Sequence, residues 1–272
     1  MLIIQDKTKM KPYYVIYLLA VCSLAIADST SCSCGHSLKK HDGQEDFPFV
    51  VRVVNTITNK TMCTAAILTD SHLVTSVHCS RFIGKQPVYA VAGEGSENVQ
   101  TLKISRNHQE HAIYNPDNSL NDIAILFLES PLKFSETVIP ICVPDGRTGG
   151  GVYKLLNQNV KLIGWDLESS SLKTVDAKVS PANPCRKVFP KYIPNVLFPT
   201  QMCTFQEKGA CIQNMGSPVV YLDPKINKYV LVGIVSYGKL ECNSKFPTVE
   251  TDVSVYLRWI EYVVKRPLCH IA

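Results

Sequence analysis

The stretch Gly-Ala-Cys-Ile-Gln-Asn-Met-Gly-Ser-Pro-Val, residues 209–219, is the part of the chain from which the fold is identified. Cys211 and Pro218 set its frame, and Met215 lies between them. A thioether has no proton to give up, so Met215 cannot act as a nucleophile toward a carbonyl carbon. Whatever loop this stretch forms therefore lacks a nucleophile at that position.

Short apolar runs alternate with turn residues on both sides of this stretch. The runs are rich in β-branched residues, and Pro, Gly, Asn and Asp separate them, which is typical of β-strands. The clearest helical period comes near the end, where Leu257, Ile260 and Val264 share one face of residues 255–265, with Ser254 as the expected N-cap. The pattern predicts an all-β chain with one terminal helix, and its strands include residues 49–54, 65–68, 123–128, 160–163 and 229–235.

The N-terminus has the features of a secretory signal peptide. Lys7, Lys9 and Lys11 precede a short apolar run, and Ala25-Ile26-Ala27 is a small-x-small cleavage site. The run is short for a bilayer span, so a membrane anchor is disfavoured. We expect residues 1–27 to be removed, followed by a short polar leader at residues 28–46 that is flexible.

Charge and cysteine content narrow the class of protein. The chain of 272 residues has a formal charge of +5, which falls to +3 when the three lysines and one aspartate of residues 1–27 are removed. This mild charge, without basic blocks, argues against nucleic-acid binding. Of 11 cysteines, Cys22 leaves with the signal, and the even remainder predicts disulfides in an exported protein. No paired C-x-x-C set supports a metal site, and no cofactor is expected. Asn59, in Asn-Lys-Thr, is an N-glycosylation acceptor.

Four separate motifs resemble those of one enzyme family. Residues 73–79 read Leu-Val-Thr-Ser-Val-His-Cys, residues 121–126 read Asn-Asp-Ile-Ala-Ile-Leu, and residues 235–238 read Val-Ser-Tyr-Gly. Together with residues 209–219 they resemble the L-T-A-A-H-C, D-I-A-L-L, S-W-G and C-x-G-D-S-G-G-P motifs of the chymotrypsin-like serine proteases. The resemblance covers roughly residues 46–266.

The resemblance implies two six-stranded antiparallel β-barrels and a C-terminal α-helix. The protease-like domain would cover residues 47–272, with one barrel at about 47–147, the second at about 148–254 and the helix at about 255–265. It also implies disulfides joining Cys34 to Cys142, Cys63 to Cys79, Cys185 to Cys203, and Cys211 to Cys242. Cys32 and Cys269 are left over, and a bond between them is a separate hypothesis.

The same resemblance assigns roles to residues of a catalytic triad. His78 stands at the position of the general base, Asp122 at that of the carboxylate that orients it, and Ser236 at that of its supporting serine. The nucleophile position falls on Met215. The nearby Ser217 offers a hydroxyl, but loop geometry is expected to carry it away from His78.

Asn214 and the region before Phe47 agree with a lost activity. The family has an aspartate at the position of Asn214, buried after cleavage by pairing with a new N-terminal ammonium. A buried, unpaired carboxylate is costly, so both groups appear together or not at all. Here the aspartate is replaced, and no Arg-Ile-Val-Gly-Gly sequence precedes Phe47.

The expected substrate slot is altered too. Gln213 replaces a glycine of the oxyanion hole, and its Cβ restricts the backbone. The resemblance places Gly209 at the base of the slot and Gly238 among the pocket positions, and Thr248 replaces the glycine of a wall segment and narrows the slot. We therefore expect a secreted, inactive homologue that binds an extracellular protein: a protease, zymogen, inhibitor or receptor. The alternative is an active endopeptidase with atypical substitutions.

Overall fold

The computed structural model describes residues 32–39, 43–83, 85–144, 155–166, 171–190, 200–206, 215–238 and 246–271. Residues Ser33–Ala272 form one compact unit, which contains all the elements discussed here. Several of the predictions fall outside the described residues. They are the signal peptide, the roles of Gly209, Gln213 and Asn214, and the Cys211–Cys242 disulfide.

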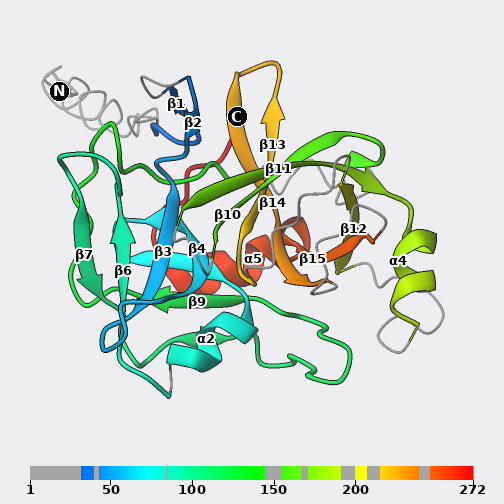
Figure 1. Ribbon diagram of the computed structural model, residues 1–272, viewed down its shortest axis with the longest axis horizontal. Helices are drawn as coiled ribbons and strands as arrows, with labels where there is room; N and C mark the ends of the chain where they lie inside the picture. The colour runs from blue at the N-terminus through cyan, green and yellow to red at the C-terminus, as the bar shows by residue number, and fades with distance from the viewer. Residues whose placement is uncertain are drawn as a thin grey trace, which may run out of the picture. The chain divides into compact units, whose positions relative to one another are not determined.

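The first half of the protein is a strongly curved antiparallel sheet with the order β7-β6-β3-β4-β5-β9-β8 (Figure 1). Its interior holds side chains that are fully or almost fully buried, from Val51 and Val53 on β3 to Leu126 on β9. The strands are β3 (Val50–Asn55), β4 (Thr61–Thr69), β5 (His72–Thr75), β6 (Val88–Ala92), β7 (Gln100–Lys103), β8 (Gln109–Glu110) and β9 (Ala124–Phe127).

This sheet has seven strands where six were predicted, and its strand pairing leaves β7 and β8 as two edge strands. An isolated bridge joins Ile104, just after β7, to Leu128, just after β9, and Gln109 of β8 pairs with Ile125 of β9. The Ser105 N–H donates to the carbonyl of Phe127 at 2.8 Å between these two contacts. The sheet therefore curls into a half-barrel, called the first barrel below, which is bridged near Ile104 and Leu128.

The second half is a closed six-stranded barrel, β10-β11-β12-β15-β14-β13, antiparallel throughout. Closure removes exposed strand edges, which would otherwise offer unpaired backbone groups. The predicted boundary between the barrels falls in residues 145–154, outside the described residues. The strands are β10 (Asn159–Trp165), β11 (Leu172–Ser180), β12 (Gln201–Gln206), β13 (Pro218–Asp223), β14 (Lys228–Tyr237) and β15 (Thr248–Asp252).

The helix α5 (Val253–Val264) packs against both barrels. The predicted face of Leu257, Ile260 and Val264 is buried in one cluster with Ile125 of β9 and Ile234 of β14. The prediction of Ser254 as N-cap is wrong. The cap is Asp252, whose carboxylate accepts from the Ser254 N–H at 3.0 Å and so satisfies a donor that the helix leaves free. The all-β class with a terminal helix is thereby confirmed.

The expectation of a flexible leader is wrong for its last part. A two-stranded hairpin, β1 (Leu38–Lys39) with β2 (Glu45–Asp46), lies before the first barrel. Gly35 donates its N–H to the carbonyl of Pro140 at 3.0 Å and accepts from the Tyr229 N–H at 2.7 Å. A Cβ at Gly35 would lie 2.2 Å from the Tyr229 carbonyl oxygen, so only glycine fits. The leader is thus bound to β14.

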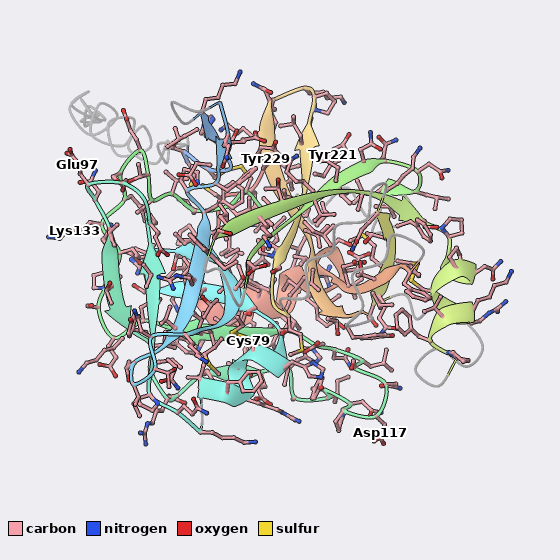
Figure 2. All side chains as sticks on the ribbon, in the orientation of Figure 1. Cys79, Glu97, Asp117, Lys133, Tyr221 and Tyr229 are labelled. Atoms are coloured by element: carbon pink, nitrogen blue, oxygen red, sulfur yellow. A yellow bond between two sulfur atoms is a disulfide. The ribbon has the colours of Figure 1, made fainter. Side chains whose placement is uncertain are left out.

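Three of the predicted disulfides are present. Cys34–Cys142 ties the leader to the segment after the first barrel, with a Cα–Cα distance of 5.0 Å. Cys63–Cys79 joins β4 to the helix α2 (Val77–Ile83), and Figure 2 labels Cys79 there. Cys185–Cys203 joins the helix α4 (Ala182–Val188) to β12. Cys32 and Cys269 are each disulfide-bonded as well, and their pairing with each other stays a prediction.

Candidate active-site cleft

His78 and Asp122 come together although 44 residues separate them in the chain. His78 is the second residue of α2, and Asp122 lies two residues before β9. The His78 Nδ1 lies 2.8 Å from the Asp122 Oδ2, and the His78 backbone N–H donates to Oδ1 at 3.2 Å. The Asp122 side chain is fully buried, whereas that of His78 is 32% exposed. The imidazole is therefore held in one orientation at an accessible surface.

The electrostatics of the pair favour a basic imidazole. The hydrogen bond to Asp122 raises the pKa of His78 above its ordinary value, and desolvation opposes this only in part. With the Nδ1 proton directed at Asp122, the neutral ring presents Nε2 as a proton acceptor.

Asp122 is supported from the second barrel. The Ser236 hydroxyl on β14 donates to the Asp122 Oδ2 at 2.5 Å, and the Thr251 hydroxyl on β15 donates to the Asp122 carbonyl at 2.9 Å. These bonds compensate a buried carboxylate that would otherwise be costly. The structure thus brings together His78, Asp122 and Ser236.

Tyr114 was not identified from the sequence, yet it meets the reactive side of His78. Its hydroxyl lies 3.3 Å from the His78 Nε2, and the two rings meet edge to face. The guanidinium of Arg81 stacks over the Tyr114 ring at 4.6 Å from the centroid. Burial raises the pKa of Tyr114 to about 12, so the phenol stays protonated and donates to Nε2 when the His78 ring is neutral. This hydroxyl occupies the hydrogen-bonding site that a nucleophile would need.

Met215 is half-buried in the turn before β13. The next residue, Gly216, has φ of +84° and donates its N–H to the carbonyl of Val235 at 2.9 Å. A Cβ on Gly216 would lie only 2.0 Å from the Thr75 Oγ1 and 2.6 Å from the Thr64 carbonyl. Because residue 216 is a glycine, this turn can pack closely against Thr75 at the end of β5, three residues before His78. Met215 directly precedes Gly216 in the same turn.

Ser217 offers no substitute nucleophile. Its side chain is fully buried, and its Oγ makes no hydrogen bond within the described part of the chain. An orphaned buried hydroxyl costs about 1–3 kcal/mol, and no proton acceptor activates it here. The structure does not bring Ser217 together with the imidazole of His78.

Two described residues of the expected substrate pocket, Gly238 and Thr248, are in contact. A Cβ on Gly238 would lie 2.9 Å from the Thr248 Cγ2, so the threonine methyl packs against the glycine of the opposite wall. Thr248 is only 5% exposed. A threonine in this space leaves less room between the two walls than a glycine would.

Behind Thr248 lies a buried acid that no sequence motif marks. The Glu250 Oε1 accepts hydrogen bonds from the hydroxyls of Thr204, at 2.7 Å, and of Thr248. The Glu250 Oε2 has no hydrogen-bond partner among the described residues. The same is true of both side-chain amide atoms of Gln206, which lies on the neighbouring strand β12. Desolvation raises the pKa of Glu250 to about 7, against the lowering effect of the threonine donors. Only burial distinguishes this glutamate from a surface one, so no sequence signal pointed to it.

The chain belongs to the trypsin family: the family's sequence model matches residues 37–260. This confirms the resemblance to the chymotrypsin-like serine proteases. Among curated relatives, venom serine protease 34 of Apis mellifera is 28% identical over 86% of this chain and 61% of its own length. A venom serine protease of Polistes dominula is 25% identical over 90% of the chain and 93% of its own length. Glucanase inhibitor protein 1 of Phytophthora sojae is 26% identical over 80% of the chain and 84% of its own length.

The chain thus spans less than two thirds of the Apis mellifera relative. No helix within the described residues is long and apolar enough to cross a membrane.

Proposed function

We propose that this protein is a secreted, catalytically inactive member of the trypsin family that acts by binding another extracellular protein. Met215 carries the proposal, because a thioether cannot attack a carbonyl carbon or form an acyl-enzyme. The role would be that of a cofactor, scaffold or decoy for a protease, zymogen, inhibitor or receptor in a proteolytic cascade.

Tyr114 supports the loss of activity independently. A general base works only if its free nitrogen can reach the proton it removes. Here the Tyr114 hydroxyl lies 3.3 Å from the His78 Nε2 and uses its acceptor site. In the serine protease subtilisin, removing the nucleophile costs on the order of a millionfold in turnover. A loss of that size would leave negligible hydrolysis.

Retention of the cleft without its nucleophile supports a binding role. The hydrogen bonds around Asp122 are intact, and they brace the junction of the barrels whether or not a bond is cut. One relative, from Phytophthora sojae, is named an inhibitor of a glucanase, and another, from Tachypleus tridentatus, a proclotting enzyme. The first name supports use of this fold for binding, and the second supports an extracellular cascade.

Export is part of the proposal. The signal sequence at residues 1–27 and the disulfide-rich domain support an oxidising compartment. Asn59 is exposed in the turn between β3 and β4. Its Oδ1 accepts from the Tyr89 hydroxyl at 2.6 Å, which leaves the amide nitrogen for a glycan.

The test is direct labelling of the secreted protein. We expect no turnover of peptide substrates and no reaction with a fluorophosphonate probe. His78→Ala serves as the matched control, because it removes the general base and keeps the rest of the cleft. Labelling of the wild-type protein that disappears in His78→Ala would instead establish the alternative, an active endopeptidase with atypical substitutions.

A further inference from the structure

A cavity of about 690 Å³ lies at the end of the first barrel, lined by residues that take no part in the cleft described above. Its floor is formed by the buried side chains of Ile83, Val88 and Ile104. Ile83 ends α2, the helix whose first turn carries His78. The cavity is therefore a separate surface of the same barrel.

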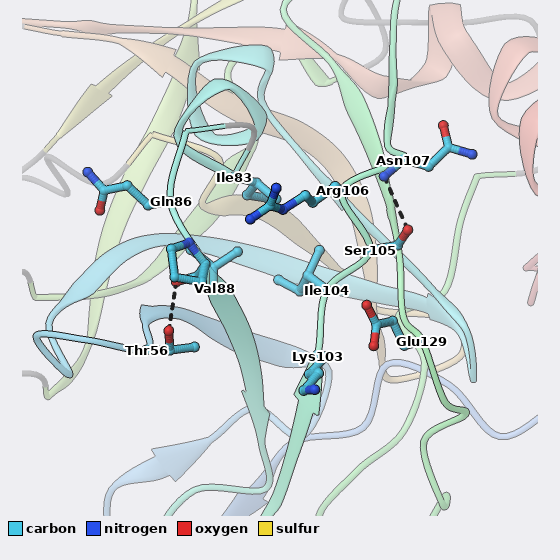
Figure 3. Close-up of a pocket in the computed structure, with 11 residues that line it drawn as sticks. Thr56, Ile83, Gln86, Val88, Lys103, Ile104, Ser105, Arg106, Asn107 and Glu129 are labelled. Carbon is cyan, nitrogen blue, oxygen red and sulfur yellow. Dashed lines mark hydrogen bonds between the residues drawn. The ribbon is translucent and has the colours of Figure 1, made fainter.

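The rim of this cavity is charged and exposed. Lys103 and Arg106 stand on it as cations, and Glu129 is its single carboxylate. In Figure 3 the Arg106 side chain reaches toward Ile83, while Lys103 and Glu129 flank Ile104. In the described part of the chain neither cation has an ion-pair partner. Lys85, exposed next to the rim residue Gln86, adds positive charge.

An exposed apolar residue follows the rim residue Thr56 in the chain. Ile57 is 80% exposed, the most exposed large hydrophobic side chain among the described residues. It follows Thr56, a rim residue whose hydroxyl donates to the Pro87 carbonyl at 3.2 Å. An apolar floor with unpaired cations on its rim, next in the chain to an exposed isoleucine, favours a protein-binding site.

We propose that this cavity, which we call the Lys103–Arg106 pocket, binds a peptide segment of a partner protein in which one large apolar residue is flanked by carboxylates. The apolar residue would cover Ile83, Val88 and Ile104, and its neighbours would pair with Lys103 and Arg106. The Glu129 carboxylate would repel the remaining acids of the segment and so weaken binding. The inference rests on the binding role proposed above and names the partner chemistry for it, at a cavity whose lining shares no residue with the cleft.

The test uses fluorescence anisotropy with a labelled peptide of the form Glu-Glu-Leu-Glu-Glu. Lys103→Gln with Arg106→Gln is expected to weaken binding by roughly tenfold, the effect of two good exposed ion pairs. Glu129→Gln is expected to strengthen binding by about twofold to fivefold, since it removes a repulsion. Binding of the wild type should fall as salt rises from about 0.05 M to about 0.5 M.

Two matched controls separate the pocket from general charge and from misfolding. Lys178→Gln with Lys187→Gln removes two exposed cations from the second barrel and should leave binding unchanged. Thr56→Trp, at an exposed rim position, should abolish binding by filling the cavity. A peptide with glutamines for glutamates and one with serine for leucine should both bind weakly.

Equal binding by wild type and the Lys103/Arg106 double variant would overturn the proposal. So would a dimer in sedimentation experiments that the double variant loses, because a second copy of the chain would then be the occupant. The outcome is independent of catalysis: anisotropy reports binding whether or not the protein turns over a substrate, and the fluorophosphonate result stands whether or not the peptide binds.

Discussion

Glu250→Gln should change the pH dependence of folding. The folded protein holds the pKa of Glu250 at about 7, compared with 4.5 for a solvated glutamate. Each pKa unit corresponds to about 1.4 kcal/mol, so ionising Glu250 costs the folded state about 3 kcal/mol. Because the folded-state pKa is the higher one, this stability is present below about pH 4.5 and is lost as the pH rises through about 7.

Glutamine mimics the protonated acid, so it should be free of this penalty. We expect wild type and Glu250→Gln to unfold with similar free energies at about pH 5, and the variant to be more stable by up to about 3 kcal/mol at about pH 8. Urea unfolding of the oxidised proteins, followed by the fluorescence of Trp165 and Trp259, measures both values. Glu136→Gln, at an exposed position, is the matched control and should show no such difference.

The refuting result is specific. A difference between wild type and Glu250→Gln that is the same at both pH values would mean that the carboxyl ionises normally in the folded protein. A wild type that gains stability over the variant as the pH rises would mean that a buried partner stabilises the carboxylate. Either outcome would remove the assignment of Glu250 as a protonated acid behind Thr248.

Met215→Ser alone should leave peptide turnover at background, because Tyr114 still covers the base; turnover far above background would contradict this. Tyr114→Phe should raise the pKa of His78 in an NMR titration, since it removes a donor that favours the neutral ring; an unchanged pKa would show that the hydrogen bond is absent, and a lower one that the hydroxyl accepts from the charged ring instead. Cys63→Ser with Cys79→Ser opens a bridge across a sequence separation of 16 and should cost about 3 kcal/mol of unfolding free energy, whereas an unchanged urea midpoint would show the bridge to be dispensable.

The fold family and most of the triad-equivalent positions can be read from the sequence without coordinates, because each of these signals is local. His78 precedes Cys79, Asp122 precedes an apolar run, and Ser236 ends another, so short motifs suffice to locate them. The strands followed from β-branched runs, and the helical face from the spacing of Leu257 and Ile260. The methionine at position 215 is equally plain in the sequence.

Only the tertiary structure shows which side chains from distant segments of the chain lie next to one another. Tyr114 reaches the His78 Nε2 across 36 residues, and Glu250 becomes an unusual acid because the second barrel closes around it. The pairing of β7 with β6 ends at Lys103, and the next residue, Ile104, bridges to Leu128 just after β9. Burial and hydrogen bonding are properties of packed neighbours, and those neighbours are specified by the whole fold and not by the residues beside them in the chain.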